Sequence, residues 1–249
     1  MKKSILIFGV VILLACNEQV KSPDVQALVD QAIEVSGGEN YGLMKVSFTF
    51  RDKHYTGENT TGGKKYSRFF LEDSLEILDV LEGGSFQRRI DGKPISVPDS
   101  TATKYANSIN SVHYFVRLPY GLNDPAVQKR YLGAAEIGGT AYHKIEVTFK
   151  EQGGGDDFED IYIYWFNKET LKPDYLAYEF HVNGGGMRFR KALNDRYVGG
   201  IRFVDYENYK PKAPKANVYK LDEQFQEGTL ELLSKIALED IQVTRDNYN

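Results

Sequence analysis

The feature that most constrains the fold is a series of glycine-rich turns between runs of alternating apolar and polar residues. The alternation is clearest at residues 46–50 and 144–149, and it is typical of strands with one buried face. The turns are Gly83-Gly84, Gly138-Gly139, Asn183-Gly184-Gly185-Gly186 and Gly199-Gly200. Because adjacent glycines readily adopt the positive φ of tight hairpins, the sequence predicts an antiparallel meander.

The individual elements follow from periodicity. Strands are predicted at residues 161–166, 175–182, 187–192 and 201–206, as consecutive neighbours in one sheet. Apolar residues at helical spacing predict helices at residues 23–36 and about 101–115. A surface crossing is predicted at residues 210–215, because prolines cannot donate to a sheet. The crossing leads to residues 217–221. A short helix near 229–234 and a strand near 236–244 complete the prediction.

Tyrosine and phenylalanine are abundant, with 17 and 14 copies, and such residues favour pleated, half-buried surfaces. No low-complexity segment or long linker divides the chain. We therefore expect one mainly β (α+β) domain over residues 24–249. Its sheet should be an antiparallel meander, interrupted by a few helices.

The N-terminal residues predict a lipoprotein signal peptide over residues 1–15. Lys2 and Lys3 precede an apolar run at 5–14, which is too short to span a bilayer. The run ends in Leu13-Leu14-Ala15-Cys16, which resembles the bacterial lipobox. We expect Cys16 to carry acyl chains such as palmitate, with residues 16–23 as a tether. The alternative is a free thiol after an ordinary cleavage site. Cys16 is the only cysteine, so no internal disulfide is expected.

The charge balance and the absence of known enzyme motifs argue against several classes of function. Without Lys2 and Lys3 the 31 basic residues fall to 29, against 35 acidic residues, which argues against nucleic acid as a partner. The sequence contains no nucleophile elbow, phosphate loop, dinucleotide fingerprint or zinc-type spacing. The four histidines are scattered, although His143 and His181 fall on predicted strands. We expect no catalysis, no cofactor and no metal site.

An acidic run and a set of three arginines each allow two interpretations. The acidic run at residues 156–160 follows three glycines and could collect oxygen ligands for Ca²⁺, but a solvated hairpin tip is the favoured interpretation. Arg188, Arg190 and Arg202 should align on neighbouring strands. They could bind an anionic head group or form cross-strand ion pairs with Asp195 or Asp205.

Several segments together resemble a family of uncharacterised lipoproteins of Bacteroidota. They are residues 118–125 (LPYGLNDP), 162–165 (YIYW), 173–178 (PDYLAY), 183–190 (NGGGMRFR), 200–203 (GIRF) and 205–206 (DY). The family is similar in plan to the LolA/LppX-like fold, in which an open antiparallel sheet wraps helices and holds acyl chains. The resemblance therefore implies a strongly curved open antiparallel meander, a half-barrel packed around a few helices. That resemblance implies a lipid-anchored envelope protein, at the outer membrane, that binds a lipid, a lipoprotein or another hydrophobic ligand.

A ligand cavity is predicted on the hollow side of the sheet, because helices need not fill it completely. The candidate ligand-binding residues are Tyr162, Tyr164, Trp165, Tyr178, Phe180, Phe189, Arg188 and Arg190. The simplest alternative is that the aromatic residues are core. The chain would then be a structural or interaction module with a filled interior, or, third in order, a hydrolase with buried carboxylates.

Overall fold

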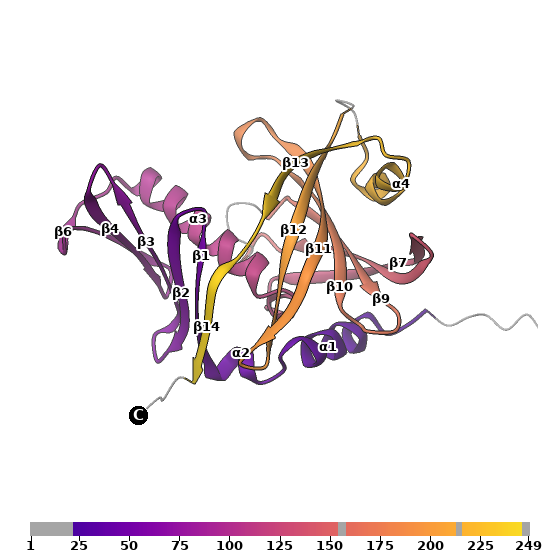
Figure 1. Cartoon of the computed structure of the whole chain (residues 1–249), viewed down its shortest axis with the longest axis horizontal. Helices are drawn as coiled ribbons and strands as arrows, with labels where there is room; N and C mark the ends of the chain where they lie inside the picture. The colour runs from indigo at the N-terminus through magenta and orange to yellow at the C-terminus, as the bar shows by residue number, and fades with distance from the viewer. Residues whose placement is uncertain (1–21, 154–157, 213–215, 246–249) are drawn as a thin grey trace, which may run out of the picture.

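The computed structural model describes residues 22–153, 158–212 and 216–245, which form two antiparallel sheets and a few helices (Figure 1). Sheet A contains β14 (Glu239–Arg245), β1 (Met44–Phe50), β2 (Lys53–Thr60), β3 (Gly63–Glu72), β4 (Leu75–Glu82), β5 (Ser85–Ile90) and β6 (Lys93–Ile95), in that order. Sheet B contains β13 (Leu230–Ile236), β12 (Ile201–Pro211), β11 (Gly186–Val198), β10 (Pro173–Phe180), β9 (Ile161–Asn167), β8 (Thr140–Phe149) and β7 (Val127–Ile137).

Helices lie between and beside the sheets. They are α1 (Val25–Ser36), α2 (Asn40–Leu43), α3 (Asp99–Val116) and α4 (Leu221–Gln226), with short 3₁₀ turns η1 (Tyr120–Asn123), η2 (Val182–Gly184) and η3 (Val218–Lys220). The long helix α3 runs from sheet A into the centre of the molecule, and α1 lies along sheet B (Figure 1). The step from β13 to β14 carries the chain from sheet B to sheet A.

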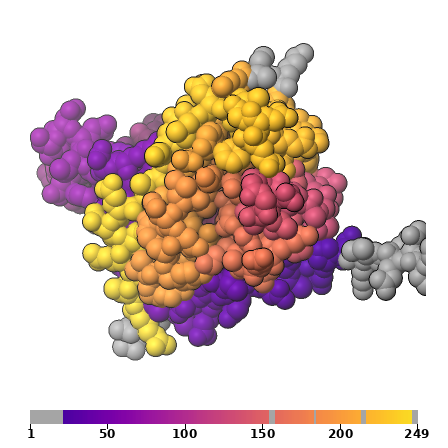
Figure 2. Space-filling model, turned by 45° about the vertical axis from the view of Figure 1, so that its right-hand side comes forward, coloured from indigo at the N-terminus to yellow at the C-terminus, as the bar shows by residue number. Residues whose placement is uncertain are grey.

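Sheet B is covered on both faces. Its inner face packs against α1 and α3 through Ile145, Tyr164 and Leu176, among others. Its outer face packs against η3 and α4 through residues that include Trp165 and Phe189. The space-filling view shows the yellow α4 segment lying on the strands of sheet B (Figure 2). The apolar run of β9 therefore has two buried faces.

The structure confirms a mainly antiparallel β fold and most predicted elements. Helices α1 and α3 lie within one or two residues of their predicted bounds, and β9, β10, β11 and β12 are consecutive neighbours. The meander is divided between two sheets, because α3 and the crossover to β7 separate the first six strands from the next.

Two predictions near the C-terminus are wrong. The helix expected near 229–234 is strand β13. The preceding residues form η3 and α4, for which no element was predicted. In addition β12 continues through Lys210 to Pro211, which lies opposite Leu230. Proline is tolerated there because the strand ends at that residue.

A buried charge network fixes α3 on sheet A. The carboxylate of Asp79 is fully buried on β4 and accepts hydrogen bonds from Arg68 (2.7 Å to Nη2) and Arg88 (2.6 Å to Nε). Arg68 also donates to the Ser108 hydroxyl on α3 at 3.1 Å. The Arg88 guanidinium lies 3.9 Å from the ring centroid of Tyr105, another α3 residue. The Asp79 carboxylate thus binds both Arg68 and Arg88, and both arginines contact α3.

His113 of α3 is a second buried polar group. Its ring stacks on Tyr66 with centroids 4.1 Å apart, and its Nε2 has no hydrogen-bond partner within the described part of the chain. Burial, reinforced by the positive charge of Arg117, lowers the pKa of His113 to about 3. The ring is therefore neutral near pH 7.

Mild acid should destabilise the fold through His113. Its pKa is about 6.5 in the unfolded chain and lower when folded, so the unfolded state binds the proton first. Stability is complete above pH 6.5 and falls with pH, with a loss of about 2 kcal/mol by pH 5 from this residue. Urea unfolding between pH 5 and 7 measures this slope. His113→Gln should flatten the slope, and an unchanged slope in that variant would rule out His113 as its source.

Candidate functional site

A pocket with mostly apolar walls lies between the two sheets, against α3. It has a volume of about 160 Å³. Val112, Phe115 and Val116 of α3 form one wall, and side chains of β1, β12 and the β13–β14 step form the others, including Val204 and Leu238. We call this site the apolar pocket. Its volume is below the 300–1,000 Å³ of typical ligand sites, so it suits part of an alkyl chain rather than a whole lipid.

Arg190 of β11 gives the apolar pocket a positive charge. Its guanidinium carbon lies 4.1 Å from the Phe115 ring centroid, and its Nη2 donates to the Tyr178 hydroxyl at 2.9 Å. The Nε atom is buried and has no partner among the described residues. No described carboxylate forms an ion pair with Arg190. A cation held in apolar surroundings without an anion is costly, so this position favours an anionic ligand.

Two more polar groups line the same pocket. Asn208 of β12 is 6% exposed, and its amide nitrogen donates to the Ser234 hydroxyl at 3.2 Å. Its Oδ1 has no partner within the described residues. Arg51, exposed in the turn between β1 and β2, adds a second positive charge at the rim. The pocket thus combines apolar walls with unsatisfied polar atoms at one end.

The inner face of sheet B brings together three of the predicted ligand-binding residues. The Tyr162 ring stacks on Tyr178 with centroids 5.5 Å apart, and Tyr164 donates or accepts a 2.8 Å hydrogen bond with Tyr114 of α3. Burial strongly raises the pKa of Tyr164. None of the three lines the apolar pocket, although Tyr178 hydrogen-bonds to Arg190, which does. Tyr162, Tyr164 and Tyr178 act here as the packing surface for α3.

Trp165 and Phe189 lie on the opposite face of the sheet, so they cannot share a cavity with the tyrosines. The Trp165 Nε1 donates to Asp222 at 3.1 Å, and Lys144 donates to the same carboxylate at 2.9 Å. Asp222 belongs to α4. This cluster therefore fixes α4 to sheet B, and the single pocket that Trp165 was predicted to share with Tyr164 does not form.

Phe180 and Arg188 line a different depression beside η2, with a volume of about 440 Å³ and mixed polar and apolar walls. Arg188 stacks on Phe180 at 5.1 Å and donates to the Met187 carbonyl. Arg202 pairs with Asp195 at 3.0 Å, one of the two partners expected from the sequence, whereas Asp205 pairs with Arg196. Of the three arginines, Arg190 is the one that reaches the apolar pocket.

The remaining predicted polar groups do not converge. His143 lies 3.3 Å from the Tyr131 hydroxyl and His181 lies 3.4 Å from Asp160. In the described ranges no group of three or more His, Cys, Asp or Glu side chains is placed to hold a metal ion. Asp156 and Asp157 of the acidic run, like Cys16, lie outside the described residues. None of the described helices combines the length and apolar character that crossing a bilayer requires.

Sequence reasoning missed most of the apolar pocket. Arg190 was a candidate, but Phe115, Val204 and Asn208 were not. Helical spacing places Phe115 on the buried side of α3, and alternation places Val204 on a buried face of β12. Neither pattern indicates that the two surfaces leave a gap, because that gap depends on how the sheets meet.

Comparison with solved structures finds several that are similar to this chain at low sequence identity. The chain is similar to a LolA superfamily protein from Nitrosomonas europaea, at 12% identity over 90% of this chain and 95% of that one, with a TM-score of 0.49. It is also similar to a DUF1329 family protein from Desulfovibrio piger, at 12% identity over 90% of this chain and 94% of that one, with a TM-score of 0.40. The lipoprotein LppX from Mycobacterium tuberculosis is similar at 11% identity over 65% of this chain and 91% of that one, with a TM-score of 0.28.

Sequence comparison places the chain in a family. No curated protein sequence matches it. A family model does match, over residues 2–238, and its description is a family of unknown function, DUF6503. The chain therefore belongs to the DUF6503 family.

Proposed function

We propose that this protein is a lipid-anchored envelope protein that binds an amphiphile, a molecule with an apolar tail and an anionic group, in the apolar pocket. The observation that carries this proposal is the Arg190 guanidinium, which contacts Phe115 beside apolar walls and has no carboxylate partner in the described chain. An alkyl tail would contact Val112 and Val204, while a carboxylate or phosphate would accept hydrogen bonds from Arg190.

Mass spectrometry of small molecules bound to the purified protein tests the proposal directly. The chain is produced without residues 1–21, so that its own acyl groups are absent. We expect an anionic lipid to be recovered at a level above a control protein purified in the same way. Recovery of no lipid above that control would count against binding.

Arg190→Met should weaken the binding of a fluorescent fatty acid. Hydrogen bonds to charged groups contribute about 1.5–3 kcal/mol, so the dissociation constant should rise roughly ten- to hundred-fold. The matched control is Arg188→Met, which removes the same charge from the same strand outside the apolar pocket. Fluorescence titration measures both. An equal loss in the two variants would indicate general charge attraction, and would contradict a role for Arg190 in recognition.

Membrane anchorage is proposed to depend on Cys16, because the apolar run and the lipobox-like residues precede it. Two acyl chains are enough for stable anchoring, since each buried methylene contributes about 0.8 kcal/mol. Labelled palmitate should enter the protein in bacterial cells, and Cys16→Ser should abolish the labelling. Equal labelling of the two proteins would refute the anchor.

A second candidate function is an interaction module without a ligand. The filled inner face of sheet B and the small volume of the apolar pocket favour it. Val204→Phe distinguishes the two functions, because it adds volume where the tail would lie. If the pocket binds a tail, this variant should lose affinity for the fluorescent fatty acid. A module would bind the fatty acid neither before nor after the change.

A further inference from the structure

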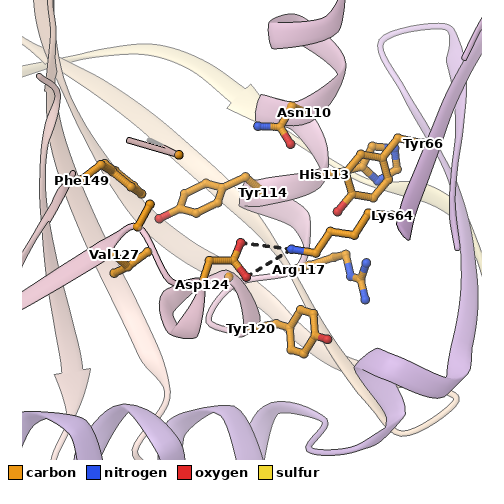
Figure 3. Close-up of a pocket in the computed structure, with 13 residues that line it drawn as sticks. Lys64, Tyr66, Asn110, His113, Tyr114, Arg117, Tyr120, Asp124, Val127 and Phe149 are labelled. Carbon is orange, nitrogen blue, oxygen red and sulfur yellow. Dashed lines mark hydrogen bonds and ion pairs between the residues drawn. The ribbon is translucent and has the colours of Figure 1, made fainter. Parts of the chain in front are cut away.

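A second pocket, with more polar walls, lies on the opposite side of α3 from the apolar pocket. It has a volume of about 130 Å³ and lies between β3, the end of α3, η1 and the start of β7 (Figure 3). Asn110, His113, Tyr114 and Arg117 line it and recur at helical spacing, so they share one face of α3. Val112, Phe115 and Val116, which line the apolar pocket, lie on the other face. We call this second site the polar pocket.

Arg117 is the buried cation of the polar pocket. The residue is 4% exposed, and its Nη2 donates to the backbone carbonyl of Tyr41. Its Nε is buried without a partner in the described ranges, and no described carboxylate pairs with its guanidinium. The charged group has five N–H donors. Most of its hydrogen-bonding capacity is thus free for a ligand.

The rim of the polar pocket contains a second cation, which is paired. Lys64 of β3 lies 3.0 Å from a carboxylate oxygen of Asp124, in the segment between η1 and β7 (Figure 3). Their side chains are 41% and 49% exposed. A pair this exposed contributes little to stability. Lys64 can therefore exchange Asp124 for another anion at small cost.

From this arrangement we propose that the polar pocket is a binding site for a small oxyanion, a phosphate or carboxylate group, which accepts hydrogen bonds from Arg117 and from Lys64. Such an anion would replace water at Arg117 and compete with Asp124 for Lys64. The pocket is too small for a large organic ligand. The proposal is independent of lipid binding, because the two pockets share only the helix between them.

Arg117 has favourable interactions within the fold. Its guanidinium carbon lies 4.9 Å from the Tyr120 ring centroid and 5.9 Å from that of Tyr41. Arg117 also follows the last residue of α3, where the helix dipole favours a positive charge. These interactions are smaller than the cost of a buried, unpaired charge. They therefore explain why an arginine is tolerated there, but they leave the free donors unexplained.

The experiment titrates inorganic phosphate into the full chain and follows the Nε–Hε resonance of Arg117 by NMR. We expect a saturable shift, assigned by its loss in Arg117→Lys. Asp124→Asn removes the competing anion and should tighten phosphate binding about three- to ten-fold, as expected for one unit charge at a partly exposed site. Lys64→Gln should weaken binding by a similar factor.

Matched controls separate this site from general charge effects. Glu227→Gln makes the same charge change as Asp124→Asn at an exposed residue beyond α4, and it should leave the affinity for phosphate unchanged. Arg190→Met should leave it unchanged as well. The proposal is overturned if Arg117 shows no saturable shift up to about 10 mM phosphate. Equal tightening by Glu227→Gln and Asp124→Asn would also overturn it.

Discussion

Asp79→Asn should lower the free energy of unfolding by about 3–5 kcal/mol, because it leaves the buried Arg68 and the half-buried Arg88 without their anion. Asp79 is fully buried, and both Arg68 and Arg88 donate to it. The hydrogen bond to Asp79 raises the pKa of Arg88. Arginine keeps its proton in proteins even without such a partner, so Arg88 cannot escape the cost by deprotonation. Urea unfolding measures the loss, and an unchanged m value would show that the unfolded state is the same.

Glu58→Gln is the matched control for Asp79→Asn. Glu58 also lies on sheet A between two cations, Lys45 at 3.1 Å and Lys65 at 3.7 Å. Its side chain is 20% exposed and both lysines are more exposed still, so we expect a change of less than about 1 kcal/mol. If the two variants lost the same stability, the burial of Asp79 would not be what makes its network important.

Trp165→Ala should also lower the free energy of unfolding by about 3–5 kcal/mol, as expected when a large buried aromatic side chain is removed. The side chain is fully buried between sheet B and α4, and its Nε1 donates a hydrogen bond to Asp222. Its loss should release the α4 segment first. Circular dichroism during urea unfolding measures the stability, and hydrogen exchange at residues 218–226 measures the release.

The same variant tests where Trp165 lies relative to the ligand. Because the residue is on the outer face of sheet B, the folded fraction of Trp165→Ala should bind the fluorescent fatty acid as the parent chain does. Trp165→Phe keeps most of the apolar volume and should cost less stability. A variant that folded normally but had lost its affinity for the fatty acid would contradict this placement. It would indicate that Trp165 contacts the ligand.

Local patterns predicted the elements whose residues determine their own structure. The stripe in α1 and the alternation in β1 and β8 appear in the structure, and the hairpin at Gly199-Gly200 has the positive φ that its glycines allow. The segment at 229–234 was misassigned as a helix. Its residues Leu230 to Ile236 form a strand because β12 offers an unpaired edge, which local sequence does not record.

The candidate site was harder to predict than the fold. The sequence identified Arg190 as a possible head-group ligand, but it grouped Tyr164 with Trp165 although adjacent residues of a strand point to opposite faces. The polar pocket was not anticipated. Asp124 belongs to a segment that the sequence identified only through resemblance, and Arg117 immediately precedes that segment. The rim pair forms between positions 60 residues apart.

The pairing of β1 with β14 has a consequence for how the chain folds. Val46 lies opposite Val243, so the two strands that complete sheet A are about 200 positions apart in sequence. Contacts this distant form slowly, because a long loop must close before any pairing is gained. The hairpins of both sheets should therefore form early, and the space between the sheets should close only in the last and slowest phase of folding.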